Sequence, residues 1–445
     1  MKTWTLRLAK IVAAILVAAI LLHVALLVAS GLALRNARAE LRAAGRPMHP
    51  DDIIPQDVPA SENAAPLYET AFALLVSESV DGKKLSSYVN SAGLEFSLDP
   101  DSNDKRIAFE NALSNPTLVQ AFNLIRKASE RPQCNFDLPY EQGALMLIPH
   151  VNGMLVAGRI LSNQALLATE RGDGQNAWQS AILALRMADS LREEPVLISA
   201  LVRIAMFEMA LASVQKVANA FPPDAETLEI LDPLIAAADD LQPVLRAFDG
   251  ERLFFGEWIF DGNNVHRLIQ DAMAVGLPSP QPRPIVWLFS YRPTRQFHHA
   301  AYLRILKQAT SDIAIPLSQA HGAPETMQDR WYGGVLHSFV PAFYRTRVNT
   351  LKLQATARVT RTGIALLRHQ AAHGAYPATL AEIDPRFLPE IHLDPFTGQP
   401  LVYRPEGDGF LLYSLGENLA DDGGTEESKD NRESKAFDVV WRMPR

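Results

Sequence analysis

Residues 11–34 read IVAAILVAAILLHVALLVASGLAL, a run of 24 residues without a charged side chain. A helix of this length, with a rise of about 1.5 Å per residue, extends roughly 36 Å and can cross a hydrocarbon core of about 30 Å. A cleavable signal peptide has a shorter apolar stretch of about 7–15 residues. We therefore predict an uncleaved transmembrane anchor over residues 11–34, with the lipid bilayer as its partner. Val28-Ala29-Ser30 resembles a cleavage site, so removal of this segment remains the alternative.

The composition indicates a globular protein of 445 residues with a formal net charge of −8. This charge argues against a nucleic-acid partner, which normally requires a basic face. Residues 417–438 contain eight acidic and three basic side chains, which predicts either a solvated acidic tail or a cation site. Cys134 is the single cysteine, which excludes an intrachain disulfide and a structural zinc site built from several cysteines.

The body of the chain has a helical pattern. Residues 35–62 predict a juxtamembrane helix followed by a proline-rich linker, and residues 63–340 predict an all-α domain with apolar residues at a period of 3.6. Within this domain, helices are expected near 63–78, 103–113, 116–129, 149–170, 174–191, 195–219, 224–238, 241–259, 263–275 and 297–316.

One helix pair, near residues 160–191, has clear boundary signals. Gly172 is a suitable C-terminal stop for the first helix, and Asp173 can cap the second. The second helix has Ala177, Ala181 and Ala184 on one face, where small side chains let another helix approach closely. The segment resembles one tetratricopeptide-type hairpin, and a tight antiparallel pair in a generic bundle is the alternative.

The C-terminal residues 341–445 predict a different architecture. A long helix over 341–373 is followed by strand candidates at 401–404, 410–414 and 437–441, with a turn at 394–398 and an acidic tail. The predicted fold class is mainly α: an N-terminal transmembrane helix, a large all-α helical domain, and a small C-terminal α+β module with an antiparallel hairpin.

Three motifs in this module suggest a family. A long helix precedes Tyr376-Pro377, then Asp-Pro-x-x-Gly-x-Pro-Leu-x-Tyr at 394–403, then Leu-Tyr-Ser-Leu-Gly at 412–416. Together, residues 345–441 resemble the C-terminal module of type II secretion major pseudopilins. Because those modules are exported, the resemblance implies a single-pass protein of the bacterial inner membrane. Residues 1–10 would lie in the cytoplasm and the bulk of the chain would face the periplasm.

The pseudopilin resemblance also implies a calcium site. In that family, the loop after Ser-Leu-Gly binds Ca²⁺ through a backbone carbonyl and several carboxylates, and Ca²⁺ accepts six to eight hard oxygen ligands. Carried over by position, the ligands are the carbonyl of Leu415, the side chain of Asn418, and carboxylates from Asp421, Asp422, Glu426 and Glu427. The positions leave open whether the 421–422 pair or the 426–427 pair binds the ion. A solvated loop without metal is the alternative.

No familiar catalytic pattern is present in the sequence. His369 and His373 have the i, i+4 spacing of zinc proteases, but Gln370 stands where a general base is needed. His298 and His299 are adjacent, which favours capping or surface roles. Cys134 and His150 could pair only through the tertiary fold.

We predict a membrane-anchored bacterial envelope protein with a structural or protein-interaction role and an unidentified protein partner. The alternatives are an envelope hydrolase with its site in the helical domain, and an accessory component of a type II secretion or pilus-like apparatus.

Overall fold

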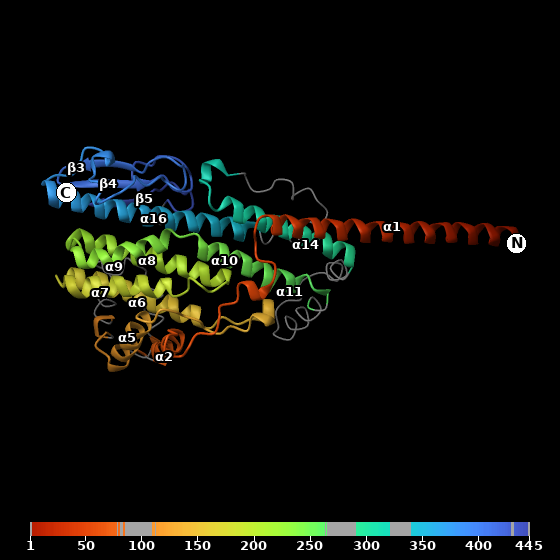
Figure 1. Cartoon of the computed structure of the whole chain (residues 1–445), viewed down its shortest axis with the longest axis horizontal. Coiled ribbons are helices and arrows are strands. Elements are labelled where there is room, and N and C mark those ends of the chain that lie inside the picture. Colours follow the sequence, from red (N-terminus) through yellow and green to blue (C-terminus); the bar gives the residue numbers. More distant parts are fainter. Residues whose placement is uncertain are drawn as a thin grey trace.

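The structure is a computed structural model that describes residues 2–77, 79–80, 83–84, 109–111, 113–262, 264, 291–320, 340–428 and 431–443. Helix α1 (Lys2–Ala43) projects from a layered helical body as a long rod, and a small sheet lies at the far end of the body (Figure 1). The predicted fold class is confirmed. The expected helix over 263–275 and most of the one over 103–113 fall outside the described residues.

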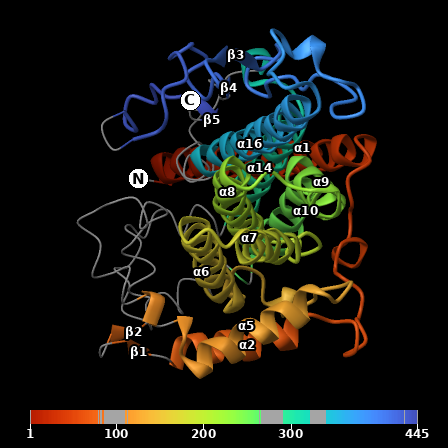
Figure 2. The same cartoon turned by 90° about the vertical axis from the view of Figure 1, so that its left-hand side faces the viewer.

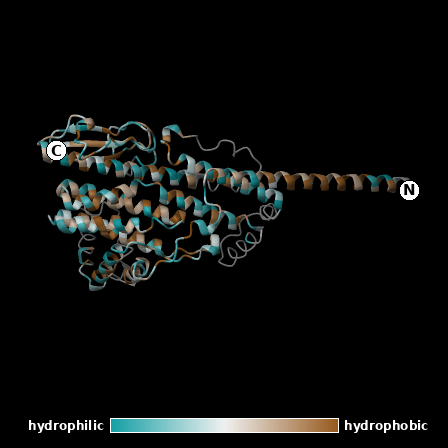
Figure 3. Cartoon of the chain, viewed as in Figure 1, coloured by the Kyte–Doolittle hydropathy of each residue, from teal (hydrophilic) through white to brown (hydrophobic). Residues whose placement is uncertain are grey.

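Helix α1 has two environments along its length. Its most apolar window is fully exposed, and the projecting part is predominantly hydrophobic (Figure 3). From Ser30 onward the helix joins the body, and Ala37 and Leu41 are buried in the main core. Of the described helices, α8 (Leu197–Ala220) also has the length and hydropathy of a membrane span, but it is mostly buried as a core helix. The exposed part of α1 is therefore the candidate membrane span.

The buried part of α1 packs in parallel with α14 (Arg292–Asp312). The two helices are joined at successive levels. The Ser30 hydroxyl donates to Gln296 Oε1 at 2.8 Å, and Lys307 Nζ forms an ion pair with Glu40 at 3.1 Å. Nearer the exposed end, His23 Nδ1 is 2.8 Å from the Tyr291 hydroxyl. The anchor therefore continues into the body without a break in its helix.

After α1, residues 44–64 cross the helical body as an ordered strap, where the sequence pattern predicts a linker. Arg46 pairs with Asp249 at 2.5 Å, and Arg246 donates to the carbonyl of Ile53 at 2.9 Å. The Ile53 side chain is buried in a small core cluster with Tyr140 and Phe254. These contacts with distant helices fix the strap, and local sequence does not reveal them.

The helical body is built in layers, with the sheet above α16, then α8 to α10, then α6 and α7, and finally α2 and α5 (Figure 2). The helices of the body are α2 (Ala65–Ser77), α5 (Pro116–Ser129), α6 (His150–Glu170), α7 (Gly174–Asp189), α9 (Ala225–Asp239), α10 (Gln242–Gly250) and α11 (Glu257–Ile259). A π-helical segment, Glu251–Gly256, joins α10 to α11. Short 3₁₀ segments are Pro50–Asp52, Tyr140–Leu145, Leu317–Gln319 and Leu380–Glu382, and β1 (Ser79–Val80) pairs with β2 (Lys83–Lys84).

The predicted boundary between α6 and α7 is confirmed. Gly172 has φ of 74°, which suits glycine, and the Asp173 carboxylate accepts from Asn176 N at 3.1 Å as an N-cap. The alanine face of α7 is buried among α6 and α8, so it forms core.

The C-terminal module consists of α16 (Val340–His373) and a three-stranded antiparallel sheet in the order β3 (Val402–Glu406), β4 (Gly409–Ser414), β5 (Val439–Met443). Trp441 on β5 packs against α16 at Gly363, where a Cβ would lie 2.1 Å from the indole ring. Its Nε1 also donates to Asn219 on α8 at 2.8 Å. The sheet is therefore fixed to both helices.

Candidate functional site

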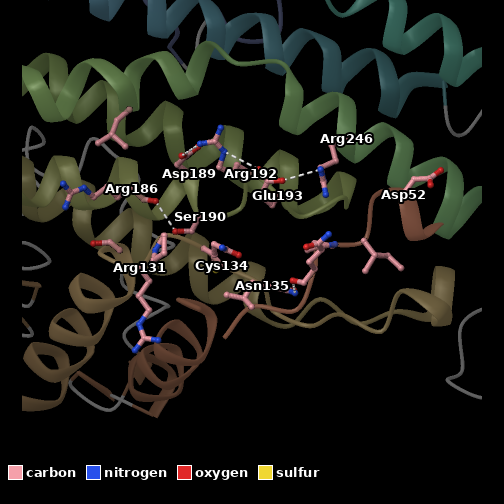
Figure 4. Close-up of a pocket in the computed structure, with 18 of the residues that line it drawn as sticks. Asp52, Arg131, Cys134, Asn135, Arg186, Asp189, Ser190, Arg192, Glu193 and Arg246 are labelled. Carbon is pink, nitrogen blue, oxygen red and sulfur yellow. Dashed lines mark hydrogen bonds and ion pairs between the residues drawn. The ribbon is translucent and has the colours of Figure 1, made fainter. Parts of the chain in front are cut away.

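A charged cleft of about 670 Å³ lies between the strap, the loop over residues 129–135, the end of α7 and the middle of α10. Figure 4 shows ion pairs along one wall, where Arg192 meets Asp189 at 3.3 Å and Arg246 meets Glu193 at 3.4 Å. Its charged lining consists of Arg131, Arg186, Arg192, Arg246, Asp51, Asp52, Asp189 and Glu193. With equal numbers of guanidinium and carboxylate groups, this lining suits a ligand that carries charges of both signs.

The only cysteine lines this cleft without the chemistry of a nucleophile. Burial raises the pKa of the Cys134 thiol well above its usual range, and the charges of Glu194 and Glu69 raise it further. A reactive cysteine needs the opposite environment, one that stabilises the thiolate. A nucleophile–base pair of Cys134 with His150, which the sequence allowed only through the tertiary fold, therefore has no support from the electrostatics of this cleft.

His150 belongs instead to a buried cluster centred on Glu194. Its Nε2 lies 3.1 Å from Glu194 Oε1, and the Ser199 hydroxyl donates to the same oxygen. Phe136 stacks on the imidazole with ring centroids 3.8 Å apart. In a catalytic triad, the serine hydroxyl donates a hydrogen bond to the imidazole. Here the Ser199 hydroxyl and the His150 imidazole both contact the Glu194 carboxylate instead. The cluster holds a loop and the starts of two helices together.

The structure also describes the surroundings of the two histidine pairs noted in the sequence, 298–299 and 369/373. His298 and His299 are buried, contrary to the expected surface or capping roles, and His299 Nε2 lies 3.5 Å from Glu257 Oε1. The rings of His369 and His373 lie 4.4 Å apart. Burial lowers the pKa of His369, as does the charge of His373.

The predicted calcium ligands lie in the loop after β4, and the structure brings only some of them together. Asn418 Nδ2 donates to Asp422 Oδ2 at 2.8 Å, and Asp421 Oδ1 accepts from the Tyr413 hydroxyl at 2.8 Å. Glu427 pairs instead with Lys352 at 2.7 Å and with Arg432 at 2.8 Å. Leu415 donates its N–H to Asp394, and the carbonyl of Glu426 accepts from Asn431.

Within the described residues, no group of three or more His, Cys, Asp or Glu side chains is gathered as a metal site. Because Lys352 and Arg432 already form ion pairs with Glu427, Asp421 and Asp422 are the better candidates for calcium ligands. Whether the loop binds calcium stays a prediction.

Two further carboxylates organise this loop, and the sequence prediction does not include them among the ligands. Asp394 accepts from Ser414 Oγ at 2.8 Å and from Leu415 N at 3.0 Å, which ties the Asp-Pro turn to the end of β4. Asp438 Oδ2 accepts from Gly424 N at 2.8 Å. Among the residues that the structure describes, Asp438 Oδ1 is buried without a hydrogen-bond partner.

The environment of Asp438 is that of an incompletely satisfied acid. Burial raises its pKa to about 6, and the nearby charge of Asp422 acts in the same direction, while the Gly424 N–H opposes it. A cation between Asp422 and Asp438 would remove the repulsion and satisfy the orphan oxygen. In the sequence, Asp438 belongs to the acidic stretch of residues 417–438 and directly precedes β5, and neither feature distinguishes it from the other acidic residues of that stretch.

The chain matches no family model, no curated protein and no solved structure. The resemblances of residues 345–441 to the pseudopilin module and of residues 160–191 to a tetratricopeptide hairpin therefore stay predictions from sequence.

The buried cluster at His150 gives a test of the site's architecture. Glu194→Ala leaves the imidazole and the Ser199 hydroxyl without their buried acceptor, so we expect the free energy of unfolding to fall by about 3 kcal/mol. Its exposed neighbour provides the control, because Glu193→Ala should change stability by less than about 0.5 kcal/mol. Chemical denaturation of the detergent-solubilised full chain measures both. Equal effects of the two substitutions would contradict the structural role of Glu194.

Proposed function

We propose that this protein is a membrane-anchored structural or protein-interaction component of the bacterial envelope, with its bulk in the periplasm. The observation that carries this proposal is α1, whose apolar half is exposed while its other half is packed into the body. An exposed apolar helical stretch of this length is stable in a bilayer and unfavourable in water. The burial of Ser30 against Gln296 also supports an uncleaved anchor, because the candidate cleavage site lies within a docked helix.

The charged cleft supports binding over catalysis. Its lining balances arginines against carboxylates, its thiol is held protonated, and the buried histidine is committed to Glu194. A polypeptide segment carries charges of both signs and fits such a lining. Among the described residues, no specific observation favours the envelope hydrolase.

An accessory role in a type II secretion or pilus-like apparatus is the second candidate. Its support is the packing of a three-stranded sheet on the 34-residue helix α16, together with the motifs of residues 376–416.

Membrane topology tests the proposal directly. We expect the full chain to leave membranes only with detergent, to keep the intact mass of an uncleaved N-terminus, and to give periplasmic activity to alkaline phosphatase fused after Arg445. An N-terminal fusion should be inactive, because residues 1–10 are placed in the cytoplasm. Activity confined to the N-terminal fusion, or release of the chain by salt alone, would reject the proposed location.

An interaction role predicts that a partner occupies the cleft. Replacing the exposed Glu193 by a photoreactive phenylalanine analogue should give one discrete protein adduct in cells after irradiation. Arg246→Glu should weaken that adduct by reversing a lining charge. The same analogue at the exposed Glu226, outside the cleft lining, is the matched control. Absence of an adduct at position 193, or identical adducts at both positions, would contradict this role.

Calcium binding in the C-terminal loop, which the pseudopilin resemblance implies, is part of the same proposal. Asn418, Asp422 and Asp438 would hold the ion with nearby backbone carbonyls, and Asp421 would support them. Calcium at one hundred times its Kd should stabilise the chain by about 2.7 kcal/mol, reversed by a chelator. Asp438→Asn should abolish the calcium response without destabilising the calcium-free protein, since burial already favours a neutral side chain there. Thermal unfolding measures this, with Glu433→Gln in the exposed tail as the control. A calcium response that survives Asp438→Asn would exclude that residue as a ligand.

A further inference from the structure

Glu208 on α8 faces α16, in the interface that joins the C-terminal module to the helical body. Its Oε1 lies 3.1 Å from the hydroxyl oxygen of Thr356. The same hydroxyl oxygen lies 3.0 Å from the carbonyl oxygen of Lys352, one turn earlier on α16. A hydroxyl has a single hydrogen and can donate it to only one of these two oxygens. Both contacts are therefore hydrogen bonds only when Glu208 supplies the second hydrogen, as a neutral carboxylic acid.

The next turn of α16 shows the same arrangement with an amide in place of the acid. Gln215 Nε2 on α8 donates to the hydroxyl oxygen of Thr360 at 2.8 Å, and the Thr360 hydroxyl donates to the carbonyl of Thr356 at 2.7 Å. This threonine accepts from α8 and donates to its own helix. A protonated Glu208 repeats the pattern at Thr356, whereas an ionised one cannot, because a carboxylate only accepts hydrogen bonds.

The surroundings of Glu208 also favour its neutral form. Burial raises the pKa of Glu208 to about 7, while Lys352 and the contact with Thr356 oppose this shift. The charged groups that act on Glu208 are Lys352 of α16 and Glu427 of the loop after β4. Helices α6, α7, α9 and α10 also pack against α8, and within the described residues none of them adds a charge that acts on Glu208. The residue is only partly buried, so water can deliver and remove its proton.

Lys352 also connects the acidic stretch of residues 417–438 to α16. Its Nζ forms an ion pair with Glu427 at 2.7 Å and lies 5.7 Å from the centre of the Phe437 ring, so two side chains of the stretch contact one ammonium group. While Glu208 is neutral, Glu427 is the carboxylate that this ammonium group compensates. When Glu208 ionises, two carboxylates compete for the same cation in an interface that is poorly hydrated.

We propose that Glu208 is a proton-binding switch: as a neutral acid it leaves Lys352 to Glu427, and as a carboxylate it draws Lys352 away and releases the acidic stretch from α16. Lys352 and Thr356 lie on one face of α16, one turn apart, and the long lysine side chain is flexible enough to change partners. The released state binds fewer protons than the attached state. Release is therefore favoured as the pH rises from about 4.3, the ordinary pKa of a glutamate, to about 7, and does not increase further above that.

Hydrogen exchange of the full chain, in a neutral detergent with a calcium chelator, tests the switch. The protection of the amides of residues 431–438, corrected for intrinsic exchange, is compared at about pH 5 and about pH 7.5. We expect it to fall several-fold in the natural chain, with a limit of about tenfold per pH unit for one proton. Glu208→Gln should remove most of this fall, because its amide can donate to Thr356 permanently. Asp438, whose pKa burial raises to about 6, contributes the remainder.

Lys352→Gln removes the shared cation, so we expect low protection of residues 431–438 at both pH values and no further effect of Glu208→Gln in the double variant. Glu226→Gln, exposed at the start of α9, and Lys216→Gln, exposed on α8, are the matched controls and should behave as the natural chain. A pH response that Glu208→Gln leaves unchanged would overturn the proposal. Full protection in Lys352→Gln, or a natural chain whose protection does not change with pH, would overturn it as well.

Discussion

The packing of α1 against α14 is the contact on which the rest of the structure depends. Ala37 and Leu41 of α1 are buried in the same core as the central helices, and Ser30 and Glu40 bind polar partners on α14. The chain therefore has no separate anchor and body. A single helix exposes the apolar surface of a candidate membrane span at one end and packs into the protein core at the other.

Buried charged groups fix the segments that lack regular structure. Asp249 forms an ion pair with Arg46 and so fixes the strap to the helices. Glu194 binds His150 at the start of α6, and Asp394 binds Ser414 and so connects the turn before β3 to the end of β4. Each carboxylate is nearly inaccessible to water and satisfied by several donors. Loss of one partner would leave a buried charge, which costs more than the pair itself contributes. These segments are therefore specific parts of the fold, although their sequences read as loops.

The helices and strands were largely predictable because their signals are local. The periodic apolar positions of the helices, the Gly172-Asp173 boundary, and the glycine-containing turn between β3 and β4 each depend on near neighbours in sequence. The cleft was not predictable, since its lining comes from segments as distant as Asp51 and Arg246. In the acidic loop, the pseudopilin resemblance offered Glu427 as one of the alternative ligands, but it forms an ion pair with Lys352 on α16. The buried Asp438 became a candidate only once its unpaired oxygen was visible.

The uninterrupted helix of α1 also has a mechanical consequence. Because it contains no break between Lys2 and Ala43, any tilt of the candidate membrane span would be transmitted to the attached helices. Single spans commonly tilt by about 20° when the bilayer is thinner than they are. The C-terminal sheet, at the opposite end of the molecule, would swing sideways by the same angle. In the proposed membrane-anchored protein, local bilayer thickness would therefore set the direction in which this sheet points.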